Sequence, residues 1–234
     1  MVAGLNVWRL ECRWGRWLTA PVLVLSLLAC TVPAWALDMT VHEVSGRRVL
    51  LMEGKFLEGD GQRLEQLLRR GPPPQEVWLH SGGGIADEGL RIGRLIRRAG
   101  LPTRIPKGAS CASACADAFM GGVARRIDEG GRYGIHMATA SGNPKLVEYV
   151  MAHIAKALES YDPKKKTFDS SPAKKIIREL EQSAAIEAAQ WGAYVLEMSG
   201  SPRIVELGTK TEASGMNWLT RRQMVDLNVI NVED

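Results

Sequence analysis

Two side chains with the chemistry of a nucleophile and a base, Ser113 and His136, lie 23 residues apart in the sequence. Ser113 is surrounded by small residues, whereas His136 ends a short strand-like run, Arg132-Tyr133-Gly134-Ile135. A serine hydroxyl attacks an acyl carbon when a nearby base takes its proton, and histidine is the side chain that most often does so. The pair therefore predicts acyl-transfer chemistry, with Cys115 and His136 as an alternative pair.

The elements that would position this pair alternate between strands and helices. Strand patterns occupy 48–52, 76–80 and 103–105, and helical patterns occupy 62–70 and the stretch after Gly84. This β-α-β-α-β order predicts an α/β fold with a largely parallel sheet and right-handed crossovers. The third strand leads toward Ser113, and an apolar helix is expected from Ala114 to Met120. A serine at such a strand-to-helix turn would lie beside the unpaired N–H groups of the helix N-terminus.

A glycine run, Ser81-Gly82-Gly83-Gly84, comes about thirty residues before Ser113. The glycine run, the serine among small residues and the Ile-His pair resemble, in this order and spacing, the proteolytic subunit of Clp protease and its crotonase-like relatives. The resemblance covers residues 47–137 well and 190–231 loosely. It implies a Clp/crotonase-like domain of repeated β-α-β units over 37–234. It also implies Ser113 as nucleophile, His136 as general base, and Gly83, Gly84 and Ala114 as the oxyanion and substrate-binding residues.

The third member of a catalytic triad is missing from its family position. The family has an aspartate two residues before the place of Trp218, and this chain has Met216 there. A third group holds the imidazole in the correct tautomer, and its loss costs orders of magnitude in rate. Glu212 is the nearest acidic residue and is taken as the candidate, with Asn217 as the nearest polar alternative.

Cys111 and Cys115 lie two residues before and two residues after Ser113. Either they form a disulfide that fixes the nucleophile turn, or they pack as free thiols. Their spacing would also suit a metal, but no second ligand pair lies nearby, so neither a metal nor another cofactor is expected.

Residues 1–36 have the pattern of an export signal. Arg9, Arg13 and Arg16 precede an apolar run over 18–29, and an A-x-A site predicts cleavage after Ala36. A lipidated Cys30 and an uncleaved N-terminal anchor are the alternatives. The pattern predicts a periplasmic or otherwise exported protein. With 30 basic and 26 acidic residues in the full chain, the charge is too balanced to indicate nucleic-acid binding.

The segment 143–200 is longer than a simple crossover requires, and it has helical patterns on both sides of a lysine-rich stretch. By the family resemblance it is a helical handle and a candidate interface of a homo-oligomer. No ATPase motif occurs in the chain. Two functions are consistent with the sequence: an exported serine hydrolase acting on a peptide or other acyl substrate, and a catalytically inactive Clp-like binding or assembly protein of the cell envelope.

Overall fold

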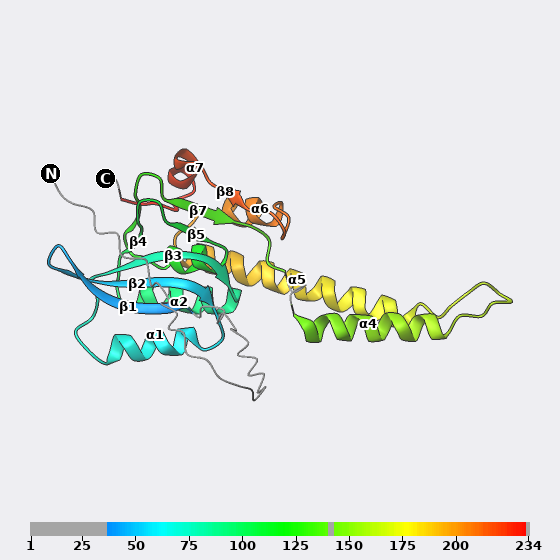
Figure 1. The fold of residues 1–234 in the computed structure, drawn as a ribbon. Helices are drawn as coiled ribbons and strands as arrows, with labels where there is room; N and C mark the ends of the chain where they lie inside the picture. The colour runs from blue at the N-terminus through cyan, green and yellow to red at the C-terminus, as the bar shows by residue number, and fades with distance from the viewer. Residues whose placement is uncertain (1–36, 140–142, 233–234) are drawn as a thin grey trace, which may run out of the picture. The chain divides into compact units, whose positions relative to one another are not determined.

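The computed structural model describes residues 37–139 and 143–232, so the expected signal at 1–36 lies outside the described residues. All described residues belong to one of the chain's two units, Pro33–Asp234. Within them the chain forms a sheet of eight strands, seen in Figure 1. The strands are β1 (Asp38–Val44), β2 (Arg47–Phe56), β3 (Glu76–Gly84), β4 (Thr103–Ile105), β5 (Ser110–Ala112), β6 (Arg125–Ile127), β7 (Arg132–Ile135) and β8 (Asn217–Trp218).

The sheet is largely parallel, which confirms the expected α/β fold class. Strands β2, β3, β5 and β7 are parallel neighbours, and β4 and β6 extend from β3 in a second parallel branch. Antiparallel pairing occurs at the two ends of the main path, between β1 and β2 and between β7 and β8. Strands β3, β5 and β7 therefore end at the same edge of the sheet, where the site described below is located.

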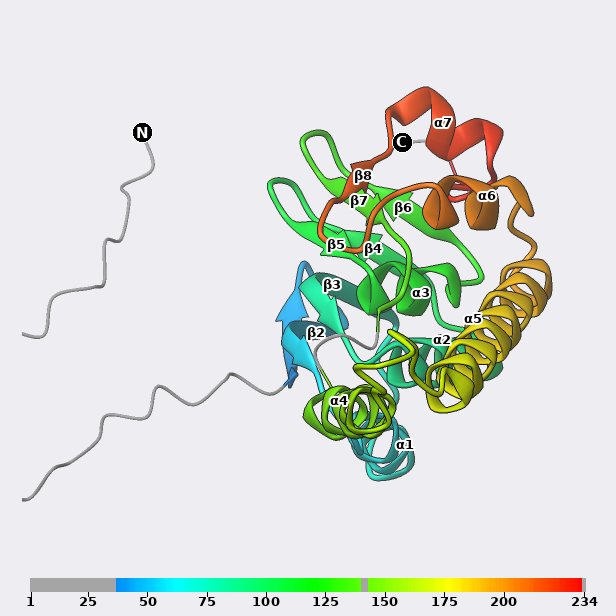
Figure 2. The same ribbon diagram turned by 90° about the vertical axis from the view of Figure 1, so that its right-hand side faces the viewer.

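Helices cover one side of the strands, as Figure 2 shows for α1, α2 and α3. The helices are α1 (Asp60–Arg69), α2 (Ala86–Arg98), α3 (Ala114–Met120), α4 (Pro144–Glu159), α5 (Ser171–Glu197), α6 (Arg203–Thr209) and α7 (Arg221–Asp226). The buried strand residues alternate, as in Val77 and Leu79 of β3, so that one face of the strand enters the core. Ile92 and Ile96 of α2 are also fully buried, which places the core between the strands and these helices.

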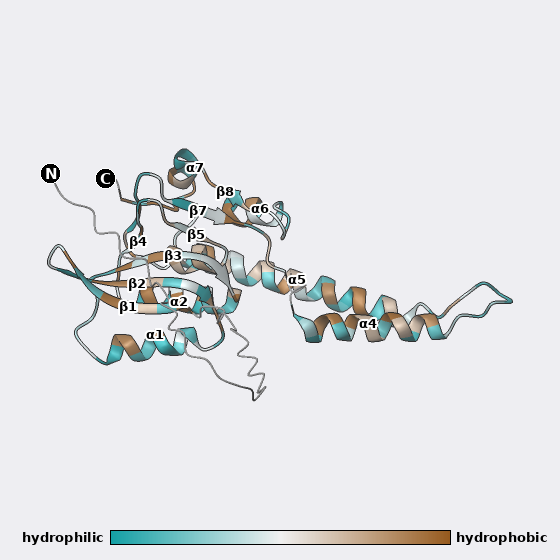
Figure 3. Ribbon diagram, viewed as in Figure 1, coloured by the Kyte–Doolittle hydropathy of each residue, from teal (hydrophilic) through white to brown (hydrophobic). Residues whose placement is uncertain are grey.

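Helices α4 and α5 form the long segment expected at 143–200. They run side by side away from the strands in Figure 1, and apolar residues recur along both in Figure 3. In α4 the only buried residue is Ala157, and in α5 the buried residues are Ile176, Tyr194 and Val195. The C-terminal part of α5 is thus the part that enters the core. Within the described ranges, none of the helices combines the length and apolar character of a membrane span.

The side chain of Arg125 connects the end of helix α3 to the C-terminal segments through hydrogen bonds. Its side chain is fully buried and donates hydrogen bonds to backbone carbonyls of Gly122, Met198, Asn228 and Val229, among others. Burial lowers the pKa of its guanidinium to about 10, which leaves the group charged at neutral pH. The charge is therefore held by main-chain dipoles from three parts of the chain.

Candidate functional site

Ser113 occupies a sharp turn between β5 and α3. Its backbone has φ 57° and ψ −128°, a conformation that costs a non-glycine residue of the order of 1–3 kcal/mol. The turn is closely packed, because a Cβ atom added to Gly83 would lie 2.6 Å from the Cβ of Ser113 and from the carbonyl oxygen of Ala112. Only glycine fits at position 83. A strained serine between a strand and a helix is the arrangement that exposes a nucleophile at the end of a sheet.

His136 directly follows β7, the strand next to β5. The register pairs Ala112 with Gly134, and the Ser113 N–H donates to the Gly134 carbonyl at 3.0 Å. Ser113 and His136 therefore lie at the carboxyl ends of two adjacent parallel strands. Both are described residues, and no hydrogen bond joins their side chains in this structure. Catalytic hydrogen bonds of this kind are often long without substrate and shorten when it binds.

The His136 ring is held by a carbonyl instead of a carboxylate. Nδ1 of His136 lies 3.1 Å from the carbonyl oxygen of Ala213, and the Met137 N–H donates to Thr211 at 3.2 Å. A carbonyl can only accept, so in the neutral imidazole Nδ1 carries the proton and Nε2 keeps its lone pair. This is the tautomer that a general base requires. Ala213 could not be found by looking for acidic residues, because its backbone oxygen makes the contact.

Glu212, the acidic candidate for the third member, does not form a hydrogen bond with His136 in the structure. Its side chain is exposed, and its carboxylate accepts a hydrogen bond from the hydroxyl of Ser214 at 3.5 Å. The carbonyl of the next residue, Ala213, contacts the imidazole instead. Asn217, the alternative, pairs with Ile135 through β8.

The glycine run at the end of β3, Gly82 to Gly84, lies against Ser113, but one of its expected oxyanion donors already has a hydrogen-bond acceptor. The Gly83 N–H, assigned to the oxyanion, donates to Oγ of Ser81 at 3.0 Å. Ala114 is the first residue of α3, so its N–H has no acceptor within the helix, and it lies 3.1 Å from where a Gly83 Cβ would be. Gly84 has φ 151°, and its α-carbon faces the backbone of Phe56 so closely that no side chain would fit. Together with Glu53, Gly54, Lys55 and His80, the glycine run lines an open depression of about 670 Å³, and neither Ser113 nor His136 is among its lining residues.

A disulfide joins Cys111 of β5 to Cys115 of α3 in the structure, with their Cα atoms 5.2 Å apart. Both side chains are fully buried. The bond therefore spans the Ser113 turn from strand to helix, and it leaves no free thiol at Cys115. Among the residues that the structure describes, no cluster of three or more His, Cys, Asp or Glu side chains is arranged to hold a metal ion.

Asp117, one turn after Ser113 in α3, contacts the long helix α5, and the sequence did not single it out. Its carboxylate accepts a hydrogen bond from Nε1 of Trp191 at 2.9 Å, and its carbonyl accepts one from the hydroxyl of Tyr194 at 2.5 Å. Burial raises the pKa of the carboxyl to about 7, although the Trp191 hydrogen bond opposes that shift. Because Trp191 and Tyr194 belong to α5, Asp117 connects the long helix to the helix that begins at the nucleophile turn.

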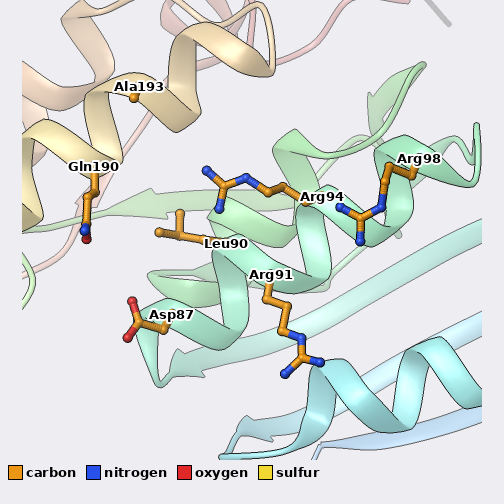
Figure 4. A pocket seen from close by; sticks show the side chains of 7 residues that line it. All are labelled: Asp87, Leu90, Arg91, Arg94, Arg98, Gln190 and Ala193. Atoms are coloured by element: carbon orange, nitrogen blue, oxygen red, sulfur yellow. The ribbon is translucent and has the colours of Figure 1, made fainter.

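A second groove lies between α2 and α5, away from Ser113. It is lined by Asp87, Leu90, Arg91, Arg94, Arg98, Gln190 and Ala193. Figure 4 shows that Arg91 is directed toward α1 whereas Arg94 is directed toward α5. Nε of Arg94 donates a hydrogen bond to the Glu197 carboxylate at 2.9 Å, and its guanidinium lies over the ring of Tyr194. The guanidinium groups thus point apart, and the groove has no convergent set of donors.

The chain is an α/β protein with a strained serine and a histidine at the carboxyl ends of two adjacent parallel strands. No family model and no curated protein matches the chain. Among solved structures it is similar to ClpP1 from Listeria monocytogenes, with 17% identity over 80% of this chain and 91% of that chain and a TM-score of 0.47. It is also similar to a variant of the 1510-N membrane-bound stomatin-specific protease in complex with a substrate peptide, with 16% identity over 78% and 72% of the two chains and a TM-score of 0.46.

Proposed function

We propose that the chain is a serine hydrolase that cleaves a peptide or a related acyl substrate. The observation that carries the proposal is the Ser113 turn. A left-handed φ is costly for serine, and it occurs here at the carboxyl end of a parallel strand, next to the strand that ends in a histidine of the base-competent tautomer.

In the proposed reaction Oγ of Ser113 attacks the acyl carbon and Nε2 of His136 takes its proton. The same proton then passes to the leaving group as the carbon–nitrogen or carbon–oxygen bond breaks. Water, deprotonated by His136, then attacks the acyl carbon, and the same proton passes to Oγ of Ser113 as the ester bond breaks and the acid is released. In the conformation of the turn seen here, the Ala114 N–H is the donor available to the oxyanion. The Ala213 carbonyl keeps the imidazole oriented.

A catalytically inactive binding or assembly protein is the second candidate, and two observations favour it. The Gly83 N–H is engaged by Ser81, and the imidazole has a neutral partner where a triad has a carboxylate. A neutral carbonyl fixes the tautomer but stabilises the imidazolium less than a carboxylate does.

A fluorophosphonate probe separates the two candidates, because it forms a bond only with an activated serine. We expect labelling of the purified protein that is lost in Ser113→Ala and strongly reduced in His136→Ala. A Ser110→Ala variant serves as the matched control, since it removes a neighbouring hydroxyl three residues away. Absence of Ser113-dependent labelling in both oxidised and reduced protein would refute the hydrolase proposal and support the binding or assembly function.

We also propose that the protein acts after export, in the periplasm, and that the α4–α5 hairpin joins copies of the chain. Export is supported by the signal pattern at 1–36 and by a disulfide, which persists in oxidising compartments. Assembly is supported by the apolar side chains of the hairpin that are exposed in the single chain, because a large exposed apolar surface often marks a protein interface. They include Val147, Met151, Ile154, Leu158, Ile177, Leu180 and Ile186.

A further inference from the structure

We propose that Ser81 is a positioning residue that controls the Gly83 N–H, holding it away from the oxyanion in the state described here. The inference rests on the proposed hydrolase function. It adds a two-state element to the site, in which the Gly83 N–H either bonds to Ser81 or faces the reacting carbon.

The Ser81 hydroxyl is buried, with a residue exposure of 5%, and both of its hydrogen-bonding capacities are used locally. Its Oγ donates to the carbonyl of Gly54 at 2.5 Å and accepts from the Gly83 N–H at 3.0 Å. Gly54 lies at the irregularity in the pairing of β2 with β3. The Ser81 hydroxyl therefore links the end of β3 to β2 and accepts the hydrogen bond from the Gly83 N–H, the group that would otherwise be offered to a substrate.

The peptide group between Gly82 and Gly83 is the one that would rotate to change this bond, and the rotation would disturb the pairing of Gly83 with Lys55 of β2. Gly83 has φ 100°, and nothing lies within 4 Å of the position that a Cβ on Gly82 would take. A peptide group between two glycines can rotate with little steric cost. The bond from a serine side chain to the N–H two residues later is also a local alternative to other backbone partners, so it competes directly with an incoming oxyanion.

The position of Gly83 makes this competition relevant to Ser113. Its α-carbon packs against the Ser113 side chain and approaches the Ala114 N–H, the other proposed donor. A rotated Gly83 N–H would thus join the Ala114 N–H on the same side of the turn. With Ser81 bonded, the site has one such donor instead of two, and losing one donor is costly in enzymes that use an oxyanion hole.

The expected size of the effect follows from the strength of one neutral hydrogen bond. Its net contribution favours the bonded state by a factor of roughly 2–12. When only the minor state is competent, removing the bond raises the observed rate by up to that factor. We therefore expect Ser81→Ala to raise the second-order rate of Ser113 phosphonylation by about 2- to 12-fold, whereas Ser81→Thr, which keeps a hydroxyl, reacts like the wild-type protein.

The experiment compares these variants with Ser113→Ala by labelling rate, melting temperature and amide hydrogen exchange at Gly83. Faster exchange at Gly83 in Ser81→Ala, but not in Ser81→Thr, together with the faster labelling, is the expected result. A rate for Ser81→Ala that is unchanged or lower than wild type would overturn the inference, because a purely structural serine would give that outcome. If no variant is labelled at Ser113, the proposed hydrolase function fails instead, and the exchange rates still report whether Ser81 holds the Gly83 N–H.

Discussion

Asp117 offers a test of how the long helix α5 is attached to the nucleophile helix. Burial raises the pKa of its carboxyl from an ordinary 3.8 to about 7 in the folded chain. The folded chain therefore holds a proton, between about pH 4 and pH 7, that the unfolded chain has lost. It follows that the contribution of Asp117 to stability is fully present below pH 4, is lost as the pH rises to about 7, and is constant above that.

The size of this contribution is bounded by the shift itself. A rise from 3.8 to about 7 corresponds to about 4 kcal/mol at most. Asp117 keeps partial solvent exposure as a residue, which screens the charge, so we expect about 1–3 kcal/mol. In Asp117→Asn the amide oxygen can still accept from Trp191, but no charge is left to bury. The variant should therefore be more stable than wild type at pH 8 by this amount and similar to it at pH 4.5.

Urea denaturation of wild type and Asp117→Asn at pH 4.5, 6 and 8 measures this difference, and other titrating groups cancel in the comparison. Asp117→Ala is the control, because it leaves the Trp191 N–H without its acceptor and should be less stable than the Asn variant at each pH. If the stability difference between wild type and Asp117→Asn is the same at pH 4.5 and pH 8, the carboxyl does not titrate as described and the reasoning is refuted.

Three further predictions concern the disulfide, the export signal and the hairpin. Reduction of the disulfide should lower the melting temperature of the wild-type protein by about 4–8 °C, because a short disulfide loop contributes about 2 kcal/mol to stability. The same reducing agent should not change the melting temperature of a Cys111→Ala/Cys115→Ala variant. Equal shifts in both proteins would contradict a stabilising disulfide. Mass spectrometry of protein recovered from the periplasm should find Leu37 at the N-terminus, whereas a lipidated Cys30 would support the lipoprotein alternative and an intact Met1 the anchor. Leu180→Glu should reduce the sedimentation coefficient by dissociating copies of the chain, whereas Val41→Glu, an equally exposed position on β1, should not; an unchanged value in Leu180→Glu would exclude this part of the hairpin from an interface.

The sequence predicted the parts of the fold that have strong periodic signals. The parallel strands β2 and β3 and the helix α3 after Ser113 were expected from apolar runs of ordinary length. Strands β5, β6 and β8, of two or three residues each, and the seven-residue β1 were not predicted, whereas the three-residue β4 was predicted at 103–105. The positions of β5, β6 and β8 are fixed by pairing with distant strands, and this information is not local.

The site shows the same limit at the level of single groups. Ser113 and His136 were predicted because their side chains are distinctive and their spacing matches a family. The partner of His136 is a backbone carbonyl of Ala213, and every residue has a carbonyl, so residue type could not identify it. The competing acceptor for the Gly83 N–H is a serine that belonged to the recognised motif, and only the geometry shows that its hydroxyl turns toward the loop.

Met216 provides a way to ask whether the neutral partner of His136 limits the chemistry. β7 and β8 pair Gly134 with Trp218 and Ile135 with Asn217, so His136 and Met216 are the residues that come next to this pairing on the two strands. The Met216 side chain already covers Gly134, two residues before His136 and on the same face of the strand. A carboxylate introduced here would lie near the imidazole and could stabilise its charged form.

We expect Met216→Asp to raise the rate of Ser113 phosphonylation by roughly ten-fold or more, since a triad carboxylate accounts for up to about 10⁴ in rate in serine proteases. Met216→Asn is the matched control, because it has the same shape and hydrogen-bonding reach without the charge. A gain in Met216→Asp alone would show that Ser113 and His136 are competent and lack only charge stabilisation. Equal rates in both variants, with the fold intact by circular dichroism, would mean that the carbonyl of Ala213 already supplies all that His136 can use.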